Sequence, residues 1–136
     1  MIKNSTAPFA AFLLRISLGI LFLAHVGLKI FVMSVPGFVG FFASLGLPAI
    51  AAYATIFLEL LGGIALILGI YASWVAIPLA LEIVGTVVMV HGKHGWLFTN
   101  KGGGWEYPAL WAVALAVLFL LGDGAYALKR PSRSMS

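Results

Sequence analysis

The fold class is decided by residues 9–32, FAAFLLRISLGILFLAHVGLKIFV, a nearly unbroken apolar run. A helix needs about 20 residues to cross the hydrocarbon core of a bilayer, and this run is longer. It also exceeds the roughly 7–15 apolar residues of a signal peptide, and no small-x-small cleavage site leads from it into a polar mature domain. We therefore expect a retained first membrane helix over residues 8–31.

Three further apolar segments are long enough to span a bilayer. They cover residues 48–70, 72–91 and 108–128. Residues 34–47 are also apolar, but proline and glycine break the segment and it is too short to cross. This pattern predicts a short re-entrant or interfacial segment between the first two helices. The sequence as a whole predicts an all-α fold, an integral-membrane four-helix bundle forming a single transmembrane domain over residues 1–136.

Composition agrees with a lipid environment. The chain is 62% hydrophobic and 9% charged, whereas soluble domains carry about 25% charged residues. It has no cysteine, which excludes disulfides, thiol nucleophiles and thiolate metal sites, and we expect no metal centre. The net charge of +4 comes without a basic stripe of interleaved aromatic residues. We therefore expect the lipid bilayer as a partner and no nucleic acid.

The distribution of lysine and arginine predicts the orientation. Basic residues flank both ends of the apolar region, at Lys3, Lys129, Arg130 and Arg133. An even number of spans places both ends on one side, and short basic flanks favour the cytoplasmic side. We expect a multi-pass protein of the inner (cytoplasmic) membrane with both the N-terminus and the C-terminus in the cytoplasm.

Four charged residues lie where a membrane span should have none. A charge at the bilayer centre costs at least about 2.5–3.5 kcal/mol on insertion scales. At about 1.5 Å per helical residue, Arg15 lies roughly 10 Å from the cytoplasmic edge, and Asp123 comes to nearly the same level from the other end of the chain. Glu59 and Glu82 both fall near the midplane on adjacent spans.

These charges allow two interpretations. Arg15 could pair with Asp123 or Glu59 as a buried structural latch. Alternatively, the charges surround an internal site. One cation does not easily neutralise two glutamates, so Glu59 or Glu82 would hold or share a proton, and such a group can bond a quinone oxygen or pass a proton.

A second group of polar residues, which includes His25, Lys29 and Glu106, gathers toward the outer edge. His25 and Lys29 share one arc of roughly 80° on the first helix with the deeper Arg15, and this arc must face protein or water. Lys29 could instead extend to the headgroups. Glu106 precedes a helix start at Pro108 and could complement the helix dipole. The nearby aromatic residues read mainly as an interfacial belt, made of Trp96, Trp105, Tyr107 and Trp111.

Four stretches of the chain resemble the DoxX family of small membrane proteins. They are LLRISLGILFLAHVGLKI at 13–30, FFASLGLP at 41–48, FLELLGGIALILGI at 57–70 and GGGWEYPAL at 102–110. The resemblance covers nearly the whole chain, in the expected order, and implies a four-helix membrane bundle. By match to its motifs it carries over Arg15, His25, Lys29, Glu59 and Glu106 as site residues. Glu82 matches no motif, so its candidacy rests on depth and helix face.

Some DoxX relatives are small subunits of membrane oxidoreductases that pass electrons to quinone. The resemblance therefore implies a subunit of a membrane redox complex with an intramembrane polar pocket for a quinone or similar small molecule. A redox-enzyme partner would supply the electrons, and a homo-oligomer is compatible with the sequence. We expect no intrinsic cofactor, and nothing selects a haem held by His25 and His91. Two alternatives stay open: a non-catalytic assembly or anchor subunit, and a small dimeric transporter for anionic solutes.

Overall fold

The computed structural model describes residues 6–97, 99–101 and 103–129 of the chain. Within these residues the regular structure is helical, apart from one isolated β-bridge between Ile70 and Lys129. The helices in chain order are α1 (Ala7–Gly27), α2 (Val35–Ser44), α3 (Ala49–Leu68), α4 (Ala72–Thr86) and α5 (Glu106–Leu121). α1 continues into the π-helical turn η1 (Leu28–Val32), and α4 into the π-helical turn η2 (Val87–His91) and the 3-10 turn η3 (Gly92–His94).

Three continuous helical stretches of the described chain are long and apolar enough to cross a bilayer. They cover Ala7–Val32, Ala49–Leu68 and Ala72–His94. These stretches agree closely with the first three predicted spans. α5 has 16 residues and is therefore about 24 Å long, shorter than the roughly 30 Å hydrocarbon core. The count of four spans stays a prediction.

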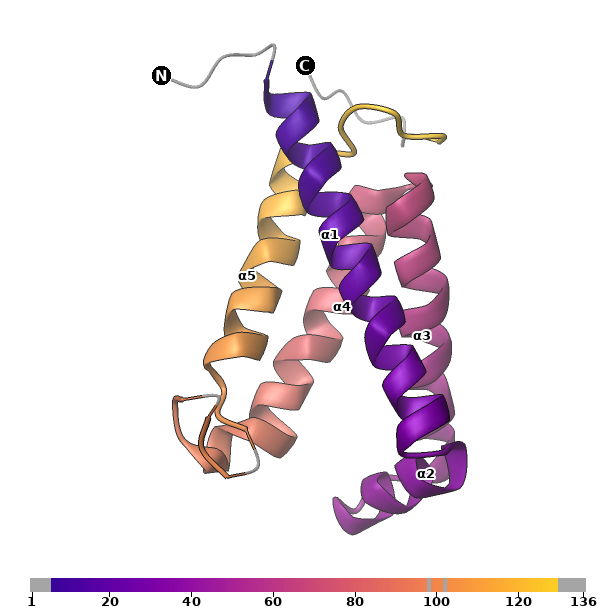
Figure 1. The fold of residues 1–136 in the computed structure, drawn as a ribbon, viewed down its shortest axis with the longest axis vertical. Helices are drawn as coiled ribbons and strands as arrows, with labels where there is room; N and C mark the ends of the chain where they lie inside the picture. The colour runs from indigo at the N-terminus through magenta and orange to yellow at the C-terminus, as the bar shows by residue number, and fades with distance from the viewer. Residues whose placement is uncertain (1–5, 98, 102, 130–136) are drawn as a thin grey trace.

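The four long helices run alternately up and down (Figure 1). α1 packs on α3, α4 packs on α5, and α3 joins the two pairs by packing on α4. α2 lies across the far end of α1 and α3, as Figure 1 shows. The segment between the first two helices thus forms a short helix at one end of the bundle, and its position relative to a membrane stays a prediction.

The predicted fourth span, residues 108–128, extends too far. α5 ends at Leu121, because Gly122 and Gly124 take positive φ angles of 89° and 82° that favour glycine. The chain then turns back across the bundle, where the N–H of Leu128 donates to the carbonyl of Leu68 at 3.1 Å. The predicted span was based on hydropathy alone, and it therefore extended through this turn.

The start of α1 and the segment after α5 lie at the same end of the bundle (Figure 1). Ala125 N–H donates to the carbonyl of Pro8 at 2.9 Å, which joins the two directly. The basic residues Lys3, Arg130 and Arg133, on which the orientation partly depends, lie outside the described residues.

Large apolar side chains occupy both the interior and the outside of the bundle. Phe22, Leu79 and Leu115 are fully buried where the helices meet, whereas Phe31 is 86% exposed and Leu13 67% exposed. In water, so many exposed apolar side chains would be costly, whereas acyl chains can cover them. The outer surface therefore suits lipid.

Candidate functional site

A cluster of buried and partly buried ionisable side chains joins three helical segments of the bundle. Lys29 comes from η1, Glu59 from the middle of α3 and Glu82 from α4. The Lys29 ammonium forms an ion pair with the Glu59 carboxylate, and Glu59 is only 3% exposed. The Phe38 ring of α2 lies 5.3 Å from the Lys29 ammonium and covers it at the end of the bundle. We call Lys29, Glu59 and Glu82 the carboxylate cluster.

Glu82 is the unusual member of the carboxylate cluster. It interacts electrostatically with both Glu59 and Lys29. Both of its carboxyl oxygens are buried, and neither meets hydrogen-bond geometry with a partner among the described residues. Buried polar atoms are nearly always hydrogen-bonded. The cluster therefore combines one cation, two carboxyl groups and two buried oxygen atoms that can still accept or, when protonated, donate a hydrogen bond.

The local helix geometry helps to place Lys29. A π-helical turn holds more residues per turn than an α-helix and changes the direction of the side chains within it; such turns are frequent at functional sites. Lys29 is the second residue of this turn, and it keeps the protein-facing direction that the helical wheel of the first helix predicted. The sequence offered snorkelling as one role for Lys29, but the structure turns its ammonium toward Glu59 of α3.

Arg15 lies in a different network, at the end of the bundle where the described chain begins and ends. It is fully buried. Its guanidinium donates to the carbonyls of Leu66 at 2.9 Å and Ile67 at 3.0 Å, in the last turn of α3. It also donates to the carbonyls of Asp123 at 3.1 Å and Ala125 at 2.8 Å. The structure thus brings Arg15 to the main chain at Asp123 and not into the carboxylate cluster.

Asp123 has a role that the sequence did not indicate. Its carboxylate oxygens accept hydrogen bonds from the backbone N–H groups of Ala72 at 3.0 Å and Ser73 at 3.1 Å. These are unpaired donors in the first turn of α4, so Asp123 caps that helix from a distant part of the chain. The signal available in the sequence was an aspartate between two glycines, Gly122 and Gly124, at the end of an apolar run.

His25 packs between α1 and α5. Its Nδ1 lies 2.9 Å from the carbonyl oxygen of Leu21, and its ring centroid lies 4.7 Å from that of Trp111. His91 lies elsewhere, with Nδ1 2.9 Å from the carbonyl oxygen of Gly103. Across the described residues, no group of three or more His, Cys, Asp or Glu side chains could hold a metal ion.

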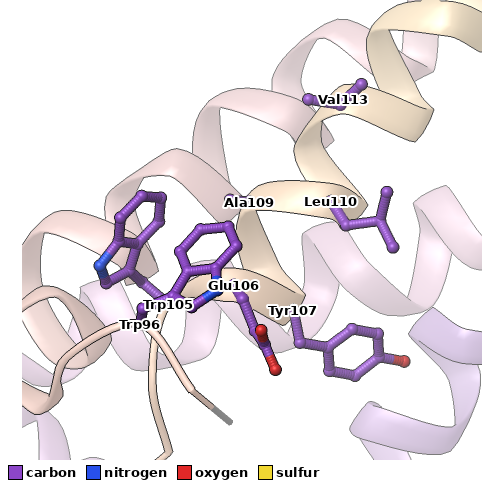
Figure 2. A pocket seen from close by; sticks show the side chains of 7 residues that line it. All are labelled: Trp96, Trp105, Glu106, Tyr107, Ala109, Leu110 and Val113. Atoms are coloured by element: carbon purple, nitrogen blue, oxygen red, sulfur yellow. The ribbon is translucent and has the colours of Figure 1, made fainter.

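Glu106 lies at the start of α5 and borders a cavity of about 780 Å³ (Figure 2). We call this cavity the aromatic pocket. It is lined by Trp96, Trp105, Glu106, Tyr107, Ala109, Leu110 and Val113. The sequence predicted that these aromatic residues form a belt at the membrane interface, and it did not predict a pocket. The signal that could have indicated one is the Gly-rich turn with a tryptophan on each side.

Within the described residues, the helical fold, the long apolar helices and the buried charged side chains define a small polytopic membrane protein. The chain belongs to the DoxX family, whose model matches residues 10–92. That match contains Arg15, His25, Lys29, Glu59 and Glu82. It ends before Glu106 and α5, so the resemblance at 102–110 lies outside it.

One relative bears a functional name. The chain is 34% identical over 90 residues to "Putative oxidoreductase CatD" of Bacillus subtilis (strain 168). The match covers 66% of this chain and 66% of the relative, just under two thirds of its length. No solved structure matches the chain.

Proposed function

We propose that this DoxX protein is a small subunit of a membrane redox complex, in which the carboxylate cluster binds a quinone or similar small molecule and handles its protons. The observation that carries the proposal is Glu82, which interacts with Glu59 beside an ion pair that contains only one cation, and whose two buried oxygens meet strict hydrogen-bond geometry with no described residue. Such an atom is suited to a ligand oxygen that can accept or donate a hydrogen bond.

The chemistry follows from the charges. Lys29 forms its ion pair with Glu59, and in the proposal Glu82, which has no ion pair among the described residues, is the member that holds a proton. A quinone takes up two electrons and two protons on reduction. In the proposal the electrons come from a redox partner protein, while Glu82 donates a hydrogen bond and then a proton to the ligand oxygen. Glu59, beside it, can pass the replacement proton.

Membership of the DoxX family and the oxidoreductase name of the Bacillus relative support a redox role. We also propose that the protein lies in the inner membrane with both ends in the cytoplasm. Two features support the placement of both ends on one side: the alternating helices, and the position of the start of α1 and the segment after α5 at one end of the bundle.

The test is purification in a mild detergent, followed by mass spectrometry of bound quinones and partner proteins. Quinone should co-purify with the wild type, and Glu82→Leu, which has no polar side-chain atom to meet the ligand oxygen, should retain much less. Glu106→Gln is the matched control, because it removes one carboxylate outside the cluster. Equal quinone in all three samples would contradict the role of Glu82, and a stable complex without quinone would favour the assembly-subunit alternative.

A further inference from the structure

The aromatic pocket lies outside the carboxylate cluster and carries an inference independent of the proposed function. It is built on the loop that joins η3 to α5. Two arms of this loop pair through their backbones: Trp105 N–H donates to the carbonyl of Gly95 at 2.9 Å, and Glu106 N–H to the carbonyl of Trp96 at 3.0 Å. The pairing fixes Trp96 and Trp105 beside each other.

Glycine makes the close approach of the two arms possible. A Cβ atom added to Gly104 would lie 2.2 Å from the carbonyl oxygen of Leu97, a distance that no side chain could tolerate. The hydrogen bond from His91 Nδ1 to the carbonyl of Gly103 also ties the loop to η2. The aromatic pocket is therefore held by defined contacts at both arms of the loop.

The aromatic pocket combines aromatic faces with one negative charge. The rings of Trp96 and Trp105 lie 4.4 Å apart between centroids and nearly at right angles, at 77°. Figure 2 shows the Glu106 carboxylate between Trp105 and Tyr107. Aromatic rings around a carboxylate attract organic ammonium groups, because the ring faces and the carboxylate both favour a positive charge.

The remaining wall of the pocket is apolar and extends along α5. Leu110 is 65% exposed and Val113 58% exposed, so this wall faces the lipid. A cavity of about 780 Å³ is within the range of small-molecule sites, roughly 300–1,000 Å³. Lys93, in η3, and Lys101, in the loop that follows, are both exposed and lie outside the lining of the pocket.

We propose that the aromatic pocket binds a phospholipid with an ammonium headgroup, with the ammonium against Trp105 and Glu106 and the acyl chains along α5. The occupant is an amphiphile and not a free amine, because the apolar wall of Leu110 and Val113 continues from the polar end of the pocket. This lipid would fix the loop against the outer end of the bundle.

The test is native mass spectrometry of the delipidated full chain, titrated with phosphatidylethanolamine or with phosphatidylglycerol of the same acyl chains. The wild type should bind phosphatidylethanolamine about fivefold more tightly than phosphatidylglycerol. Glu106→Gln should remove most of this preference. Trp105→Leu should weaken phosphatidylethanolamine binding by a similar factor, whereas Trp74→Leu, a matched change on α4 at the opposite end of the bundle, should leave it unchanged.

Several outcomes would overturn the proposal. One is equal binding of the two lipids by the wild type, and another is a preference that survives Glu106→Gln. Binding of soluble glycerophosphoethanolamine as tight as that of the whole lipid would overturn the assignment to an amphiphile. If Trp105→Leu abolished self-association of the protein without any change in lipid binding, the aromatic pocket would instead be a contact surface for a second copy of this chain. Glu82→Leu should not change the lipid preference, which separates this result from the proposed function.

Discussion

Arg15 shows how this bundle accommodates a fully buried charge. A guanidinium has five N–H donors in a planar arrangement, and Arg15 uses them on backbone carbonyls of α3 and of the segment after α5. Helix ends leave carbonyls without partners, and those of Leu66 and Ile67 belong to the last turn of α3. Arg15 therefore joins three parts of the chain that are far apart in sequence.

Replacing Arg15 should lower the stability of the fold. Arg15→Met should lower the free energy of unfolding by several kcal/mol, since each buried carbonyl that loses its donor costs about 1–3 kcal/mol. Arg15→Lys should fall in between, because lysine lacks the planar fork. Thermal unfolding in detergent, followed by circular dichroism, measures the effect. Ser17→Ala, at an exposed site on the same helix, is the control, and an equal melting temperature for it and Arg15→Met would contradict the account.

The Lys29–Glu59 pair is suited to a double-mutant cycle. Lys29→Met should cost about 3–5 kcal/mol, because it leaves carboxyl groups buried without their cation. The double variant Lys29→Met/Glu59→Leu should recover at least half of that loss, since both charges are then gone. Unfolding in detergent, compared among the wild type, two single variants and the double variant, gives the coupling energy. Additive losses would show that the pair is not coupled.

Close helix crossing is what holds α1 against α3. A Cβ atom added to Gly19 of α1 would lie 2.9 Å from the carbonyl oxygen of Gly63 and 2.6 Å from Cγ1 of Ile67 on α3. Small residues at such a crossing let two backbones approach closely in a membrane. This contact also sets the distance at which Lys29, two turns and more further along, reaches Glu59.

Two glycines of α1 provide a matched comparison. Gly19→Ala should destabilise the bundle by about 1–3 kcal/mol, because the added methyl group forces α1 away from α3. Gly27→Ala should be neutral or slightly stabilising, since nothing lies within 4 Å of its added Cβ and alanine favours the helix. Melting temperatures of the two variants in the same detergent test this. Equal losses would show that helix propensity, and not the crossing, determines the effect.

The sequence predicted the apolar elements better than the neighbours of each side chain. Hydrophobic length and proline and glycine positions gave the first three spans within a few residues, because crossing a bilayer imposes a minimum length. The end of α5 was wrong, because Leu128 and its neighbours are apolar although Gly122 has already ended the helix. Hydropathy reports the solvent of a segment and not its backbone conformation.

The sequence predicted the depth of the candidate site residues in the membrane, but not which side chains form ion pairs with each other. Glu59 and Glu82 were placed near the midplane on adjacent spans, and the structure places them close together. The partner of Glu59 is Lys29, which the sequence placed on the protein-facing arc of the first helix, with the headgroups as an alternative, but did not pair with Glu59. The helical wheel gave the facing of Lys29 but not its partner, because pairing depends on how η1 and α3 pack against each other and a wheel describes one helix alone.

The whole molecule is an alternating bundle whose described ends meet. Because the chain has no cysteine, single cysteines can report its orientation directly. Asn100→Cys should react with a membrane-impermeant maleimide in intact cells, whereas Thr6→Cys and Leu128→Cys should react only after the membrane is permeabilised. Opposite labelling of Thr6→Cys and Leu128→Cys would contradict the shared side, and reaction of both in intact cells would reverse the orientation.

The central claim is that Glu82 meets a quinone inside the bundle, and equilibrium binding tests it most directly. The measurement is titration of purified protein in nanodiscs with a short-chain quinone analogue, for the wild type, Glu82→Leu and Glu106→Gln. We predict that the wild type and Glu106→Gln bind with equal affinity. Glu82→Leu has no polar side-chain atom and should bind about tenfold more weakly than the wild type, as expected for the loss of one hydrogen bond to a buried group. Equal affinity in all three proteins, or no binding by the wild type, would contradict the account.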